Sequence, residues 1–174
     1  DRATQPLERR PGRRSRRRVH ALMSLFSRRA ERTPLDGVDA VVADLDGVVY
    51  AGPGPLPYAV ESLTRAADTR RLGYITNNAS RRDSAVAEHL RGLGLTATQP
   101  DDVVTSPQAA MRLLRERVEP GATVLVVGGD GLVYELEKAG YRVTRSADDV
   151  PAAVVQGFAQ DVGWLQLAEA SYAL

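Results

Sequence analysis

The sequence predicts an α/β fold in which parallel strands alternate with helices. Short apolar runs such as residues 41–43 and 72–75 stop abruptly at polar residues, as buried parallel strands do at their carboxyl ends. Segments with apolar residues at helical spacing follow these runs, for example residues 82–93. Hydrophobic residues make up 43% of the 174 residues, which is enough to bury a core.

The first part of the chain is predicted to contain three strands, each followed by a helix. Between the first strand and the first helix, Gly52–Pro57 holds too many glycines and prolines for regular structure and is predicted to form a turn. Pro107 suits the first turn of the third helix. The expected elements are a strand from residue 41, a helix at about 58–70, a strand at 72–76, a helix at 82–93, a strand at 103–104 and a helix at 107–118.

A second α/β unit is predicted to begin after Pro120-Gly121. Its elements are expected at 123–127, 132–139, 141–144, 152–155 and 161–173, in the order β-α-β-β-α. Gly128-Gly129-Asp130-Gly131 lacks the Gly-x-Gly-x-x-Gly spacing of a dinucleotide loop, so a Rossmann-type oxidoreductase is the weaker enzyme alternative. These glycines are predicted to serve a tight turn into the helix.

Asp44 and Asp46 stand one residue apart where the first strand ends, and Gly47 lets the chain turn away. At such an edge one carboxylate can attack phosphorus and a second carboxyl can donate a proton to the leaving oxygen. The alternative is a calcium loop or a polar turn. An EF-hand loop needs a further acid or amide before its glycine and follows a helix, and neither condition is met.

Thr76, Asn77 and Asn78 close the second strand before a helix. A hydroxyl and free backbone N–H groups at a strand-to-helix junction form a natural phosphate site, because the helix start supplies unpaired donors. The alternative is that Thr76 or Ser80 simply caps the next helix.

Together these stretches resemble the haloacid dehalogenase superfamily of phosphatases. Its first motif, an apolar strand ending in Asp-x-Asp-Gly, is matched by Asp44–Val49, and its second, an apolar strand ending in Ser or Thr, by Thr76. Over about residues 38–174 the chain is similar to the class IIA branch, which includes p-nitrophenyl, phosphoglycolate and nucleotide phosphatases. The stretches that carry this similarity are Asp46–Tyr50, Pro53–Pro57, Ile75–Arg81, Val104–Ser106 and Val124–Leu132.

The resemblance implies a Rossmann-like parallel-sheet core with an inserted α/β cap domain. Residues 36–119 would be the N-terminal half of the core, and residues 120–174 the first half of the cap. The implied activity is hydrolysis of a small phosphorylated metabolite through an aspartyl-phosphate, with Mg²⁺ as cofactor. Which ester is cleaved stays open.

The same resemblance assigns roles to five residues. Asp44 would be the nucleophile and a magnesium ligand, and Asp46 the general acid and base, whose backbone carbonyl also binds the metal. Thr76 and the backbone N–H of Asn77 would hold the phosphoryl oxygens, and Asn78 would orient the loop.

The family's third motif, a lysine, and its fourth, a Gly-Asp pair with a later aspartate, are not found in the sequence. Its one lysine, Lys138, is expected on an exposed helix face, and Asp148-Asp149 is expected in a loop. We therefore expect an N-terminal fragment, whose 174 residues alone hydrolyse phosphate esters barely above background. The alternative is a catalytically inactive remnant, or an anion-binding or interaction module with a basic tail.

Residues 1–33 hold eleven arginines against three acids, a net charge of +8, whereas residues 34–174 carry −7. A basic tail over residues 1–35 is predicted to be disordered, with nucleic-acid binding unlikely except through this tail. Met23 is the expected natural start. His20 and His89 are expected to be isolated surface residues. The absence of cysteine fits a reducing cytoplasm, and no apolar stretch reaches the roughly 20 residues that span a bilayer.

Overall fold

The computed structural model describes residues 33–174, so most of the predicted basic tail and Met23 lie outside the described residues. Residues 39–174 form one compact unit. In the described part of the chain, no helix is both long and apolar enough to cross a membrane.

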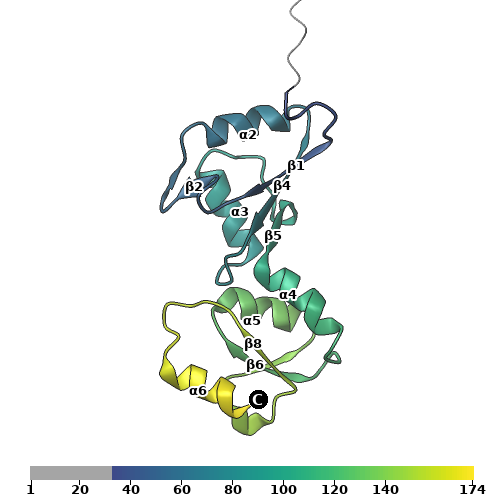
Figure 1. Cartoon of the computed structure of the whole chain (residues 1–174), viewed down its shortest axis with the longest axis vertical. Helices are drawn as coiled ribbons and strands as arrows, with labels where there is room; N and C mark the ends of the chain where they lie inside the picture. Colours follow the sequence, from purple (N-terminus) through teal and green to yellow (C-terminus); the bar gives the residue numbers. More distant parts are fainter. Residues whose placement is uncertain (1–32) are drawn as a thin grey trace, which may run out of the picture. The chain divides into compact units, whose positions relative to one another are not determined.

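The first sheet has three parallel strands in the order β1 (Ala40–Asp44), β4 (Arg71–Thr76) and β5 (Val103–Thr105). Helices α2 (Ala59–Ala67) and α3 (Asp83–Gly92) join them along the chain (Figure 1). Apolar side chains of α3 and the partly buried ones of α2 pack on the strands and on the turn after β1. The fully buried members of this core are Leu45, Val49, Ala87 and Leu90.

The other face of this sheet carries apolar side chains that remain exposed. Val42 is 60% exposed, Ile75 46% and Val104 51%, and they contribute to the lining of a hollow of about 760 Å³. β1 is an edge strand, with β4 as its partner. Within the described residues, the sheet therefore has an exposed apolar face and an open edge at β1.

We predict that this face makes the 174-residue chain, expressed alone, bind apolar dyes. Val104→Thr should lower the fluorescence of bound anilinonaphthalene sulfonate and change the free energy of unfolding by less than about 0.5 kcal/mol. Its neighbour Val103 is 2% exposed, so Val103→Thr should destabilise by about 1–3 kcal/mol because it buries a hydroxyl. Equal dye binding by wild type and Val104→Thr would contradict an accessible apolar face.

The segment after β1 is more regular than the sequence predicts. Gly47 has a φ of +82°, and the chain returns through a short antiparallel hairpin of β2 (Tyr50–Ala51) and β3 (Gly54–Pro55). The prediction that Gly52–Pro57 is too rich in breakers for regular structure is therefore wrong for Gly54–Pro55. Two strands of two residues each can still pair, because Pro55 lies in a strand with a single partner.

The second sheet has β6 (Thr123–Val127) at its centre, between β7 (Arg142–Thr144) and β8 (Ala153–Gln156), all parallel. Helices α4 (Ser106–Arg115) and α5 (Asp130–Lys138) pack on one face and α6 (Trp164–Tyr172) on the other. Figure 1 shows α5 and α6 on opposite sides of β6 and β8. The remaining elements are the short 3₁₀ helices η2 (Pro100–Asp102) and η3 (Ala147–Asp149).

The predicted α/β class is confirmed, and the predicted helices and strands lie within about three residues of the observed ones. Asp148-Asp149, expected in a loop, lies in η3. Lys138 is exposed at the end of α5, as expected. The division at residue 120 into a core half and a cap half stays a prediction.

Candidate active site

The two aspartates lie on either side of a buried anchor. Asp44 is the last residue of β1 and is exposed, as is Asp46, whereas Leu45 between them is fully buried. The Leu45 carbonyl accepts hydrogen bonds from the N–H groups of Val48, Val49 and Tyr50, which tightens the turn. Asp44 Oδ1 accepts a hydrogen bond of 2.8 Å from the Leu45 N–H. Both aspartates are thus exposed to solvent at the carboxyl end of β1, on either side of a tight turn.

The loop after β4 is ordered by its own side chains. Thr76 is buried, and its Oγ1 accepts a hydrogen bond from the Asn78 N–H at 3.1 Å. Asn78 Oδ1 in turn accepts from Ser80 N at 2.9 Å and from Ser80 Oγ at 2.8 Å. The Asn77 carbonyl accepts from Ser106 Oγ at 3.1 Å. Helix α3 begins after Arg82 with no side-chain cap, so Thr76 and Ser80 do not cap it as the alternative proposed.

The register between β1 and β4 brings the two motifs together at the carboxyl ends of these strands. Asp44 lies opposite Ile75, and Thr76 follows directly in β4. A pocket of about 470 Å³ is lined by Asp46 and Asn78, so these two predicted residues meet around one space. Asp44, Thr76 and Asn77 border this edge but do not line the pocket.

Five further residues line this pocket, and the sequence did not single them out as site residues: Gly52 and Pro53 of the hairpin, and the side chains of Tyr50, Arg81 and His89. The ring of Tyr50 is buried and meets the His89 ring edge to face, with 4.9 Å between centroids. Burial raises the pKa of the Tyr50 phenol, as do the charges of Asp46 and Asp44, while Arg81 lowers it. The prediction that His89 is an isolated surface residue is therefore wrong. The helical spacing of apolar residues could have predicted that His89 lies next to the buried Leu90 in a helix. It could not have predicted that the His89 ring contacts Tyr50.

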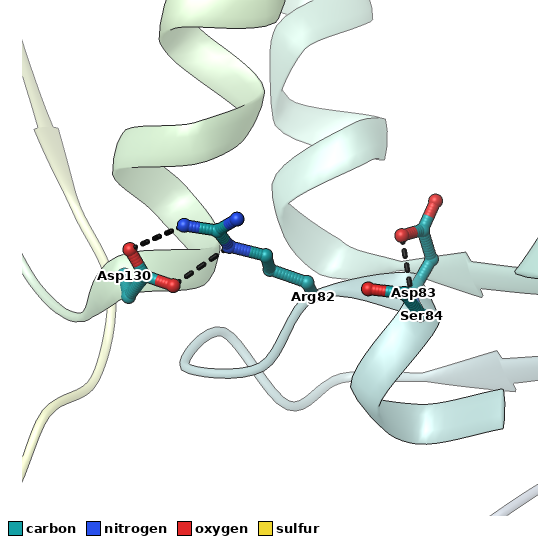
Figure 2. A network of polar contacts seen from close by, with 4 residues as sticks. All are labelled: Arg82, Asp83, Ser84 and Asp130. Atoms are coloured by element: carbon teal, nitrogen blue, oxygen red, sulfur yellow. Dashed lines mark hydrogen bonds and ion pairs between the residues drawn. The ribbon is translucent and has the colours of Figure 1, made fainter. Parts of the chain in front are cut away.

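An ion pair fixes the end of the loop after β4. Arg82 donates two hydrogen bonds to Asp130, from Nε at 2.7 Å and from Nη2 at 2.8 Å. Figure 2 shows this bidentate pair between the start of α5 and the residue before α3. The Arg82 guanidinium also lies 4.3 Å from the centroid of the Tyr134 ring. Two helices are joined by one side chain.

The hydrogen bonds from Arg82 lower the pKa of the Asp130 carboxyl. Because folding lowers this pKa, the pair contributes stability above the ordinary value of 3.8 and loses it as the pH falls through the lower folded value. Both side chains are partly exposed, so the contribution is small.

The glycines among residues 128–131 let the loop after β4 approach the start of α5 closely. A Cβ on Gly131 would lie 2.7 Å from the carbonyl carbon and oxygen of Arg81, and the Gly131 N–H donates to the Ser80 carbonyl at 3.2 Å. A Cβ on Gly129 would lie 3.4 Å from Ser80. The predicted turn into the helix is present, but the glycines also have a packing function that spacing alone did not reveal.

Both Asp44 and Asp46 offer carboxylate oxygens to solvent at the carboxyl end of β1. Oxygen atoms of this type are the ligands that hard divalent cations prefer. Residues 33–174 contain no group of three or more Asp, Glu, His or Cys side chains that could hold a metal ion. The two aspartates by themselves would therefore supply only part of the ligands of such an ion.

The sequence profile of haloacid dehalogenase-like hydrolases matches residues 41–142, which include both aspartates, the loop after β4 and the glycines of α5. The chain belongs to this family. The resemblance to the p-nitrophenyl phosphatase branch is likewise confirmed by the relatives. The D-glycerol 3-phosphate phosphatase of Mycobacterium tuberculosis is 47% identical over 136 residues, which are 78% of this chain and 38% of that protein.

Solved structures agree with this assignment. The glycerol phosphate phosphatase of Mycobacterium tuberculosis in complex with magnesium superposes with a TM-score of 0.71 at 46% identity, over 77% of this chain and 40% of that one. The p-nitrophenyl phosphatase from Archaeoglobus fulgidus gives a TM-score of 0.67 at 26% identity, over 78% and 50%. This hydrolase-family chain therefore spans well under two thirds of the length of these relatives.

Proposed function

We propose that the protein containing this chain is a Mg²⁺-dependent phosphomonoester hydrolase that acts through an aspartyl-phosphate. The observation that carries the proposal is the meeting of two solvent-facing aspartates at the end of β1 with the Thr76 loop at the end of β4. The carboxyl ends of parallel strands are where α/β sheets bind their ligands. The family assignment and the named activities of the relatives support the same reaction class.

In the proposed reaction, an Asp44 carboxylate oxygen forms a bond to phosphorus while the bond from phosphorus to the ester oxygen breaks. Asp46 gives its proton to that oxygen, so the leaving group departs as an alcohol. Asp46 then removes a proton from water, whose oxygen attacks the aspartyl-phosphate. Phosphate leaves and the Asp44 carboxylate is restored.

The Thr76 loop is proposed to hold the phosphoryl oxygens with the Thr76 hydroxyl and the Asn77 N–H. The Asn78 side chain is proposed to orient this loop, which is supported by its two hydrogen bonds to Ser80. Asp44 and the Asp46 carbonyl would hold Mg²⁺, and the ion would offset the repulsion between the attacking carboxylate and the anionic phosphate. Water, substrate and other protein groups would supply its remaining ligands.

Hydrolysis of phosphate monoesters should depend on Mg²⁺ in the whole protein. We expect the release of inorganic phosphate from glycerol 3-phosphate or p-nitrophenyl phosphate to stop with excess EDTA and to return when Mg²⁺ is added beyond the chelator. The 174-residue chain alone should stay near background. Hydrolysis by the whole protein that persists in EDTA would contradict the metal dependence.

A whole protein that binds phosphate esters but never cleaves them would instead support the inactive, anion-binding alternative. Robust Mg²⁺-dependent turnover by the 174-residue chain, lost in Asp44→Asn, would contradict the prediction that the chain needs further protein to act. The cytoplasmic location stays a prediction.

A further inference from the structure

The pocket beside Asp46 is lined by a positively charged side chain that none of the proposed steps uses. Arg81 lines this pocket of about 470 Å³. Within residues 33–174, its guanidinium takes part in no hydrogen bond or ion pair, whereas its neighbour Arg82 donates two hydrogen bonds to Asp130. A guanidinium carries five N–H donors, so Arg81 brings unused donor capacity to the space next to the proposed general acid.

The other polar groups of the pocket add further donors. The Asn78 Oδ1 already accepts two hydrogen bonds from Ser80, which leaves its amide NH₂ as the remaining group. The His89 ring is held edge to face against Tyr50 and forms part of the wall. Asp46 is the one carboxylate in the lining. Apart from the Asp46 carboxyl, which is proposed to protonate the leaving oxygen, the pocket therefore offers mainly hydrogen-bond donors.

Arg81 is also held in place by its backbone. The Ser80 carbonyl accepts from the Gly131 N–H, the Arg81 backbone lies so near Gly131 that an added Cβ would be 2.7 Å from its carbonyl, and the next residue is bound by Asp130. The Arg81 side chain lines the pocket, so a guanidinium on a fixed backbone is presented to this space. Fixing the backbone in advance lowers the entropy that a bound ligand must otherwise offset.

We propose that Arg81 determines specificity by binding the distal oxygens of the leaving group, which favours short alcohols that carry hydroxyl or carboxylate oxygens. This inference rests on the proposed phosphatase function. Donors that face a pocket are satisfied by ligand oxygens and are left unpaired by an alkyl group, so the site discriminates against leaving groups without them. The pocket lies beside Asp46, where the departing alcohol must be when it receives its proton.

The test compares glycerol 3-phosphate with n-propyl phosphate, which has the same three carbons but neither hydroxyl. In the whole protein, Arg81→Met should lower kcat/KM for glycerol 3-phosphate by about 10- to 100-fold, mainly through KM, and for propyl phosphate by less than about 3-fold. Arg81→Lys should fall between wild type and Arg81→Met. Arg112, exposed on α4 and outside the pocket, provides the control Arg112→Met, which should change neither substrate.

Each outcome separates this inference from the proposed function. An equal loss for both substrates in Arg81→Met would overturn it, because Arg81 would then act on the phosphoryl group or on the fold, and so would no loss for either. If wild type cleaves neither ester, the proposed function fails first. Phosphoglycolate, which carries a carboxylate, should follow glycerol 3-phosphate in losing affinity.

Discussion

Asp44→Asn is expected to lower phosphatase turnover of the whole protein by at least about 10⁴-fold, because the amide cannot form the aspartyl-phosphate. The change should leave the fold intact. Asp44 is exposed, and the amide oxygen of Asn can still accept the hydrogen bond from the Leu45 N–H. Phosphate release measured beside a thermal unfolding curve separates the two effects, and a melting temperature close to that of wild type is expected.

Asp46→Asn serves as the matched control, since it lies in the same turn and is equally open to solvent. If Asp46 donates the proton, its loss should matter most for an alkyl phosphate, whose leaving oxygen must be protonated, and least for p-nitrophenyl phosphate. Asp44→Asn should abolish both activities equally, because every leaving group needs the nucleophile. If Asp46→Asn abolished both activities and Asp44→Asn mainly the cleavage of the alkyl phosphate, the two assigned roles would be reversed. Full activity of Asp44→Asn would show that Asp44 is not the nucleophile.

Gly131→Ala is expected to destabilise the protein by about 1–3 kcal/mol, although helix propensity alone predicts the opposite. The added Cβ would lie 2.7 Å from the Arg81 carbonyl group, and a backbone cannot turn aside as a flexible side chain can. Gly92 is the control, because it ends α3 with nothing within 4 Å of an added Cβ. Gly92→Ala should be neutral or stabilise by up to about 1 kcal/mol, measured for both variants by urea unfolding.

The two substitutions should also differ in activity. Because Gly131 contacts the segment that ends the Thr76 loop, Gly131→Ala should raise KM for phosphate esters, whereas Gly92→Ala should leave kinetics unchanged. The KM measurement is made well below the unfolding midpoint, so that loss of folded protein does not contribute. A Gly131→Ala variant as stable as Gly92→Ala would show that the close contact between α5 and Arg81 does not form in solution.

The two motifs can be recognised in the sequence because each consists of residues that are close together along the chain. Asp44, Asp46 and Thr76 come at the ends of apolar strands, and both the α/β class and the end of the sheet proposed to bind ligands follow from that pattern alone. The strand β6 was placed at its observed residues, because four apolar residues in a row after Thr123 suit a strand buried on both faces. Periodicity of apolar residues is a local property, so it is visible in one sequence.

The pocket and the contact between α5 and the Thr76 loop were decided by tertiary structure. Arg82 and Asp130 are 48 residues apart, the His89 ring of α3 meets the Tyr50 ring of β2, and neither pairing follows from spacing along the chain. Gly131 looked like a turn residue, because a sequence shows that a side chain is missing but not what occupies its place. The sequence by itself identified the residues that are proposed to do the chemistry; only packing between distant elements decided which other side chains lie beside them.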